Sequence, residues 1–139
     1  MRLHVTTTLL LMVALLCSCS TVANSDPDTD INSEGCSPAT YSDDDPYGDV
    51  VNEALHEVLS VTPHDPKFVH NTIINGDVDN GHFNVFAHGD CNANLSADDC
   101  TTCMEAAYND IITLCNNHFG GIIGMVDCSI YYVVQFNTS

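Results

Sequence analysis

Three cysteines close together are the residues most able to do chemistry in this chain. The stretch CNANLSADDCTTC places Cys91, Cys100 and Cys103 with eight and then two residues between them. Sulfurs at such spacing can be part of a zinc site, a redox-active pair with a third cysteine nearby, or part of a disulfide framework. The choice depends on the compartment in which the chain folds, because disulfides persist in oxidising compartments.

The N-terminus indicates that compartment. Arg2 is followed by an apolar run from Val5 to Cys17, and small residues at Thr21 and Ala23 suit a signal peptidase. We therefore predict that residues 1–23 are a secretory signal peptide. A membrane span needs about 20 apolar residues, whereas threonines interrupt this run. A lipoprotein cleavage site is disfavoured because the bulky Leu16 precedes the first cysteine.

Six cysteines remain once the predicted signal peptide is removed. An even number is typical of disulfides in a small secreted domain, although six cysteines allow 15 connectivities. Nearby histidines do not complete a recognised zinc spacing, so we predict no metal site. Acidic residues surround the CxxC pair, which disfavours the thiolate that redox catalysis needs. The six cysteines are Cys36, Cys91, Cys100, Cys103, Cys115 and Cys128.

The charge of the chain excludes two classes of partner. Beyond residue 23, Lys67 is the only Lys or Arg against 19 Asp and Glu, a net charge of −18 with histidine neutral. Such a chain cannot displace counterions from nucleic acid, and an anionic membrane surface repels it. We predict neither nucleic-acid binding nor membrane insertion.

Apolar periodicity predicts the elements that hold the cysteines. We predict a loose acidic leader over 24–35, and a domain over 36–139. A first helix is expected with Asp45 as N-cap, Pro46 at its first position and an apolar stripe over 50–59. Strands are expected near 67–74 and 82–88, joined by a tight turn at Asn80-Gly81.

The second half of the chain returns to helical spacing. Ser96 is the expected N-cap of a second helix, and Cys100, Cys103 and Cys115 lie on one buried stripe of it. A β-branched and aromatic run near 121–136 predicts one or two further strands. The order of elements indicates an α+β domain with two helices packed on an antiparallel sheet.

The cysteine pattern, together with SADDCTTC, LCNN and VDC, resembles the ginkbilobin-type cysteine-rich domain of land plants, also called the salt-stress-response/antifungal domain. The resemblance covers Cys36 to about Phe136. It implies a five-stranded antiparallel sheet with two helices and three disulfides, a secreted protein of the plant apoplast, and roles in defence. The implied pairs are Cys36–Cys115, Cys91–Cys100 and Cys103–Cys128.

The resemblance also implies where a sugar would bind. A mannose-binding member of the family uses an Asn after the first cysteine, an Arg seven residues after the fifth and a Glu five residues after the sixth. Carried over by position, this sequence has Ser37, Ile122 and Val133. An Arg and a Glu supply charge-assisted hydrogen bonds, so we expect the fold to be kept and the mannose site to be lost.

The sequence therefore favours a non-enzymatic extracellular recognition protein whose partner is a protein or a glycan. No nucleophile motif, metal-ligand spacing or cofactor site is evident, so we predict no catalytic residues and no cofactor. The alternative is a carbohydrate-binding antifungal protein with a different or weakened sugar site. Its candidate contacts are Asn92, Asn94, Asn116, Asn117 and His118. Asparagine also forms turns and caps, which is a simpler explanation for most of the candidate contacts.

Two sequons complete the candidate sites. Asn94-Leu95-Ser96 lies in a predicted loop, and Asn137-Thr138-Ser139 ends the sequence. Both are acceptors for N-linked glycans in a secreted protein. We expect the second to be mostly unmodified.

Overall fold

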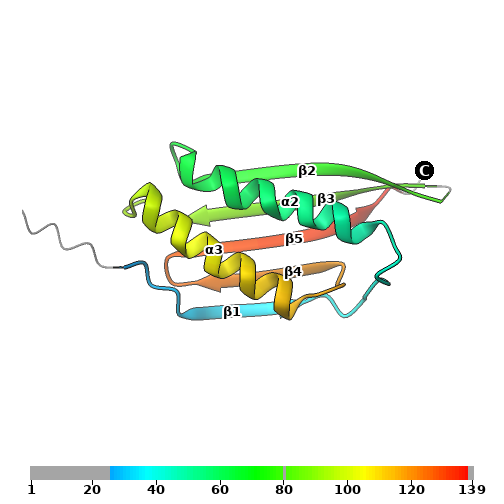
Figure 1. Cartoon of the computed structure of the whole chain (residues 1–139), viewed down its shortest axis with the longest axis horizontal. Helices are drawn as coiled ribbons and strands as arrows, with labels where there is room; N and C mark the ends of the chain where they lie inside the picture. The colour runs from blue at the N-terminus through cyan, green and yellow to red at the C-terminus, as the bar shows by residue number, and fades with distance from the viewer. Residues whose placement is uncertain (1–25, 80, 138–139) are drawn as a thin grey trace, which may run out of the picture.

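Two helices cover one face of a five-stranded antiparallel sheet in the computed structural model, which describes residues 26–79 and 81–137 (Figure 1). The strands lie in the order β1-β4-β5-β3-β2. This confirms the predicted α+β class. The elements are β1 (Ile31–Cys36), α2 (Tyr47–Val61), a short 3-10 helix (Thr62–His64), β2 (Val69–Val78), β3 (Gly81–Cys91), α3 (Ala97–Leu114), β4 (Gly120–Met125) and β5 (Cys128–Phe136).

The first helix begins one residue later than predicted. Pro46 is the N-cap of α2, and no side chain caps the helix. Asp45, predicted to be the cap, instead accepts a hydrogen bond from the backbone N–H of Ser42 at 2.7 Å. Asp45 therefore closes the turn before the helix. The apolar stripe is confirmed, with Val51, Ala54, Leu55 and Val58 buried.

The second helix follows its prediction closely. The hydroxyl of Ser96 accepts a hydrogen bond from the backbone N–H of Asp99 at 3.0 Å and donates one to the carboxylate of Asp99 at 2.7 Å. Cys100 and Cys103 are fully buried on the face that packs on the sheet, and Cys115 follows at the C-cap. The side chains of α3 thus bring three sulfurs to the sheet.

The prediction of a loose leader over 24–35 is wrong for residues 31–35. These residues form most of β1, which pairs with β4 in a register from Ile31↔Met125 to Cys36↔Gly121. Four of the six residues of β1 are exposed, so the strand shows no apolar period. Backbone hydrogen bonds can hold an edge strand even where its side chains have no apolar pattern. The domain therefore begins before Cys36. The predicted signal peptide lies outside the described residues.

The next two strands extend further than predicted. β2 and β3 pair from Val69↔Asp90 to Val78↔Gly81, so the Asn-, Gly- and Asp-rich residues 75–78 belong to the strand. Pairing with β3 satisfies their backbone groups despite low strand propensity. The turn residue Asn80 lies outside the described residues.

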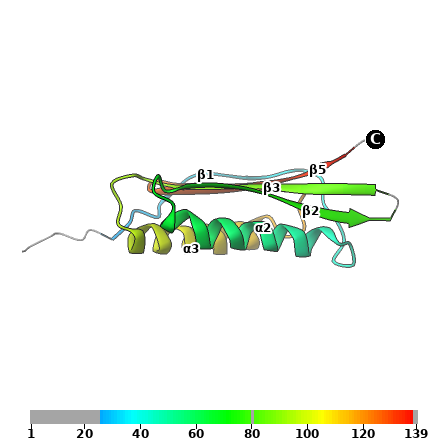
Figure 2. The same ribbon diagram turned by 90° about the horizontal axis from the view of Figure 1, so that it is seen from above.

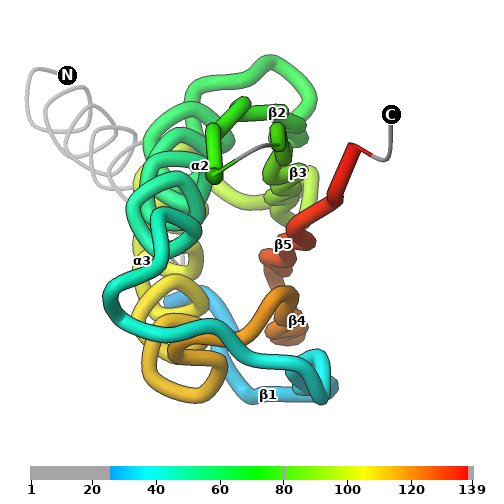
Figure 3. The backbone as a smooth tube through the Cα atoms, turned by 90° about the vertical axis from the view of Figure 1, so that its right-hand side faces the viewer, coloured from blue at the N-terminus to red at the C-terminus, as the bar shows by residue number. Residues whose placement is uncertain are grey.

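Alternation along the strands separates two faces of the sheet. Ile130, Tyr132 and Val134 of β5 are buried against the helices, whereas their neighbours point the other way. Figures 2 and 3 show that α2 and α3 both lie on one side of the sheet. The opposite side is here called the outer face, and it includes Ile73, Phe86, Tyr131, Ile122 and Val133.

Three disulfides join α3 and its C-cap to three strands. Cys36–Cys115 ties β1 to the end of α3, Cys91–Cys100 ties β3 to its first turn, and Cys103–Cys128 ties its middle to β5. These are the pairs that the family resemblance implies. All six cysteines of the described residues therefore form disulfides. Cys100 and Cys103 of the CxxC sequence pair with different strands and not with each other.

Candidate functional site

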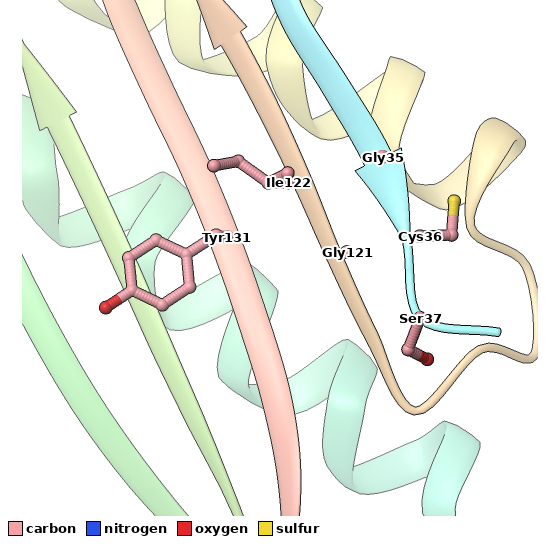
Figure 4. Close-up of a pocket in the computed structure, with 6 residues that line it drawn as sticks. All are labelled: Gly35, Cys36, Ser37, Gly121, Ile122 and Tyr131. Atoms are coloured by element: carbon pink, nitrogen blue, oxygen red, sulfur yellow. The ribbon is translucent and has the colours of Figure 1, made fainter. Parts of the chain in front are cut away.

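A pocket of about 400 Å³ opens on the outer face where β1 ends beside β4 and β5 (Figure 4). Ile122 and Tyr131 form one side as a cross-strand pair. Ser37 stands at the other side, directly after the strand (Figure 4). The six lining residues are Gly35, Cys36, Ser37, Gly121, Ile122 and Tyr131.

Backbone and disulfide contacts hold this wall of the pocket in place. The N–H of Ser37 donates to the carbonyl of Gly120 at 2.9 Å, and the ring of His118 contacts the carbonyl oxygen of Ser37 at 2.6 Å. The Cys36–Cys115 disulfide fixes the end of β1 to α3. A Cβ on Gly121 would lie 2.8 Å from the Sγ of Cys115, so glycine is what lets the crosslink pass behind the pocket.

A buried tyrosine stabilises the turn below the pocket. The hydroxyl of Tyr132 donates to the carbonyl of His118 at 2.8 Å and reaches that of Cys115 at 3.1 Å. Burial raises the pKa of Tyr132 far above its ordinary value, so the hydroxyl stays a donor at every physiological pH. The turn from α3 to β4 is thus attached to the core.

The structure brings together the three positions that the resemblance assigns to mannose. Ser37 and Ile122 both line the pocket. Val133 lies beside the pocket and not in its lining: it pairs with Gly120 across β4 and β5, and a Cβ on that glycine would lie 3.8 Å from both the Cβ of Ser37 and the Cα of Val133. Residues distant in sequence therefore converge as a binding site requires.

The chemistry of the pocket is nevertheless apolar. Ile122 is 43% exposed and Val133 is 36% exposed, and neither offers a hydrogen bond. The hydroxyl of Ser37 already donates to the carbonyl of Ala39 at 3.1 Å. None of the six lining residues is charged, so the pocket suits an uncharged, largely apolar group.

The five asparagine and histidine candidates do not form one site. Asn92 uses its amide on Asp127 at 3.1 Å and accepts from the N–H of Asn94 at 3.1 Å, so both belong to the turn before α3. Asn116, Asn117 and His118 follow the other end of that 18-residue helix. Asn117 donates to the carboxylate of Asp43 and has φ of 60°, a turn-forming conformation that asparagine tolerates.

Sequence reasoning missed a cluster around Tyr131, at the centre of the outer face. The rings of Tyr131 and His88 lie 5.2 Å apart, and the ring of Phe86, two residues before His88 on β3, lies 5.6 Å from that of Tyr131. His88 contacts the amide oxygen of Asn71 through Nδ1 at 2.7 Å and Asp90 through Nε2 at 3.5 Å. The alternation of Ser129, Tyr131 and Val133 was the available signal, but it needed the register of β5 against β3.

This cluster contains Ser, His and Asp without the geometry of a catalytic triad. The hydroxyl of Ser129 donates to the carboxylate of Asp90. Both ring nitrogens of His88 already face Asn71 and Asp90. A nucleophilic serine needs the histidine as its own hydrogen-bonded base, and here the aspartate stands between them.

The described residues hold neither a metal-binding cluster nor a membrane-spanning helix. Over 26–79 and 81–137, no three His, Cys, Asp or Glu side chains are grouped so that they could hold a metal ion. Within the same residues, neither helix is long and apolar enough to cross a membrane.

Comparison with known proteins assigns the family. Residues 35–135 match the sequence profile described as "Salt stress response/antifungal". The chain belongs to this family. The resemblance seen in the cysteine spacing is thereby confirmed.

Curated members of the salt stress response/antifungal family align with parts of the chain. "Antifungal protein ginkbilobin-2" of Ginkgo biloba is 36% identical over 48 residues, which are 34% of this chain and 36% of that protein. "Plasmodesmata-located protein 5" of Arabidopsis thaliana is 27% identical over 97 residues, 70% of this chain and 32% of that protein. The matches thus span about a third of each relative.

Solved structures of family members share the fold. The tandem DUF26 ectodomain of the Arabidopsis thaliana cysteine-rich receptor-like protein PDLP5 superposes with a TM-score of 0.66 at 24% identity, over 75% of this chain and 49% of that one. That of PDLP8 gives 0.66 at 20% identity, over 76% and 48%. The chain spans about half of each ectodomain, and its relatives include extracellular proteins.

Proposed function

We propose that this protein is a secreted, non-enzymatic recognition protein of the plant apoplast, and that its outer-face pocket does not bind mannose. The observation that carries the proposal is that Ser37 and Ile122 line one pocket and Val133 lies beside it, so that two of the three positions carry apolar side chains. This arrangement supports a binding surface that lacks the charged groups for a sugar.

The chemistry of the pocket points to an apolar group of an extracellular partner. A sugar hydroxyl pressed against Ile122 would lose its water without gaining a partner, which costs free energy. An aliphatic or aromatic side chain of a protein partner meets no such penalty there. The disulfide behind the pocket keeps the surface preorganised, and this lowers the entropic cost of binding.

A role against fungi would also work through recognition. "Antifungal" describes the Ginkgo biloba relative, and we extend it to this chain only as a binding activity. Peptides that disrupt anionic membranes are basic and amphipathic, whereas this sequence is strongly acidic. The target would be a specific protein or glycan of the extracellular space.

A carbohydrate site at a shifted position is the second candidate, favoured by the cluster around Tyr131. An aromatic ring offers a stacking surface for a pyranose. Asn71, His88 and Asp90 surround it with hydrogen-bonding groups. A glycan array probed with the unmodified protein and with Tyr131→Ala tests this candidate, since a genuine sugar signal must disappear in the variant.

Calorimetric titration with mannose and mannobiose tests the leading proposal. The unmodified protein is expected to give no saturable heat at millimolar sugar. The triple variant Ser37→Asn, Ile122→Arg, Val133→Glu restores two charged hydrogen bonds, each worth about 1.5–3 kcal/mol. At about 1.4 kcal/mol per factor of ten, we expect its affinity to rise on the order of 10²- to 10⁴-fold.

A charge-matched control separates the site from a general effect of charge. Ile112→Arg with Leu114→Glu places the same two charges on exposed positions of α3, and it is expected to leave mannose binding absent. Saturable mannose binding by the unmodified protein would contradict the proposal. Equal binding by the triple variant and the control would show that the pocket is not the site.

A further inference from the structure

The longest exposed border of the sheet is the free edge of β2. The strand order ends at β2 within the described residues, and the strand runs for ten residues, Val69–Val78 (Figures 1 and 3). A free edge presents unpaired backbone N–H and C=O groups that can template another strand. Proteins usually protect such an edge, and the two edges of this sheet differ in this respect.

The opposite edge, β1, carries the usual protection. It has six residues, contains Glu34 and is interrupted by an irregularity in its pairing between Ile31 and Ser33. Short length, charge and bulges all disfavour pairing with another chain. β2 is longer, pairs with β3 without a shift from Val69 to Val78, and its sequence VHNTIINGDV contains neither proline nor lysine.

The hydrogen bond from Cys91 to Phe68 fixes which residues of β2 have free backbone groups. The N–H of Cys91 donates to the carbonyl of Phe68 at 2.9 Å. Because successive residues of a strand direct their backbone groups to alternate sides, the even-numbered residues of β2 bond to β3. The odd-numbered residues face the free edge: Val69, Asn71, Ile73, Asn75 and Asp77.

These odd-numbered residues are self-complementary about Ile73. If a second β2 runs antiparallel with Ile73 opposite Ile73, then Asn71 lies opposite Asn75 and Val69 opposite Asp77. Each pair can exchange two backbone bonds, about ten in all. Ile73 is 59% exposed, the highest value among the exposed large hydrophobic residues of the described chain, and pairing two of them removes apolar surface from water.

The charges of the edge permit this register. Asp77 is the one acidic residue among the five, and in this pairing it faces valine rather than its own copy. The two Asp77 residues are then about 27 Å apart at ~3.4 Å per residue, well beyond the screening length of about 8 Å at physiological salt. On the inner face the same register places His70 opposite Gly76, which has no side chain of its own.

We propose that two copies of this protein pair through β2 in an antiparallel register centred on Ile73, which gives a continuous ten-stranded sheet. The two-fold axis stands perpendicular to the sheet, so both helical layers lie on one side with the acidic α2 helices next to each other. Their repulsion is screened by salt, so the dimer is stronger at 300 mM than at 20 mM NaCl.

Sedimentation of the intact disulfide-bonded protein at roughly 10 µM to 1 mM tests the pairing, because weak associations populate in this range. A dimer is expected. Ile73→Lys sets two lysines against each other and is expected to sediment as a monomer throughout. Ile112→Lys on α3, an exposed position of the other layer, is the matched control and is expected to stay dimeric. Circular dichroism checks that each variant is folded.

Hydrogen exchange adds a readout that a general loss of stability would not produce. On raising the concentration, the N–H groups of Asn71, Ile73 and Asn75 are expected to gain protection, whereas Thr72 and Ile74 are already protected by β3. A monomer at 1 mM, a dimer that persists in Ile73→Lys, a dimer weakened by salt, or concentration-dependent protection without this alternation would each overturn the proposal.

Discussion

Removing the disulfides one at a time should destabilise the protein in the order of the chain segments that they close. Cys36–Cys115 closes 79 residues, Cys103–Cys128 closes 25 and Cys91–Cys100 closes 9. A crosslink stabilises mainly by limiting the freedom of the unfolded chain, and this effect grows with the logarithm of the loop. The perturbation is replacement of each pair by two alanines.

The loop lengths set the magnitudes. The chain-entropy relation gives about 4.5 kcal/mol for the longest loop, about 3.5 for the middle one and about 2.6 for the shortest. The longest and shortest loops thus differ by about 2 kcal/mol. Typical domains have a free energy of unfolding of about 5–15 kcal/mol, so loss of Cys36–Cys115 alone removes a large share of the stability.

Thermal unfolding by circular dichroism measures this order. For a domain of this size, 1 kcal/mol shifts Tm by roughly 4 °C, so the variants lacking Cys36–Cys115 and Cys91–Cys100 should differ by about 8 °C. The three variants are refolded in vitro, so that a failure of secretion in the host does not remove the least stable of them from the comparison. Urea titration gives an independent free energy of unfolding for the same three variants.

The competing explanation, cavity formation, predicts a different order. Cys100 and Cys103 are fully buried, whereas Cys36 is only half-buried. If the cost came mainly from cavities left by the lost sulfurs, the variants that remove these buried sulfurs would be the least stable. A Tm for the Cys91–Cys100 variant at or below that of the Cys36–Cys115 variant would refute the entropic reasoning.

Three further predictions concern single residues. Gly76→Ala should lower the free energy of unfolding by about 1–3 kcal/mol in urea titration, because the new Cβ would lie 2.6 Å from the Cε1 of Phe83, whereas Gly81→Ala, which meets only Val78 at 3.7 Å, should cost less. The hydrogen bond from His70 is the main cause that lowers the pKa of Glu57, whose side chain is 38% exposed. The resulting contribution to folding stability is present above the ordinary glutamate pKa and is lost as the pH falls through the lowered pKa. Glu57→Gln should therefore flatten the fall in stability below about pH 4.5 by no more than about 1 kcal/mol, and an unchanged pH profile would contradict this assignment. Asn94 is exposed in its loop, so protein from a plant host should lose mass on glycosidase treatment, and Asn94→Gln should not.

Local signals in the sequence determined the helices and most of the strands. Ser96 and the apolar stripes fixed α3 and most of α2, because capping and burial act over one or two turns of chain. The spacing of six cysteines identified the family and with it the sheet and the crosslinks. The strongly acidic composition predicts that neither nucleic acid nor an anionic membrane is a partner.

Only the tertiary structure decided which residues share a surface. Strand pairing places Tyr131 between His88 and Ile122, although at least eight residues of sequence separate it from each of them, and it recruits the polar residues 31–35 into β1 through backbone bonds that carry no apolar signal. The free edge of β2 likewise exists because the strand order of the described residues ends there. Register and strand order depend on contacts between distant segments, and local sequence patterns do not encode them.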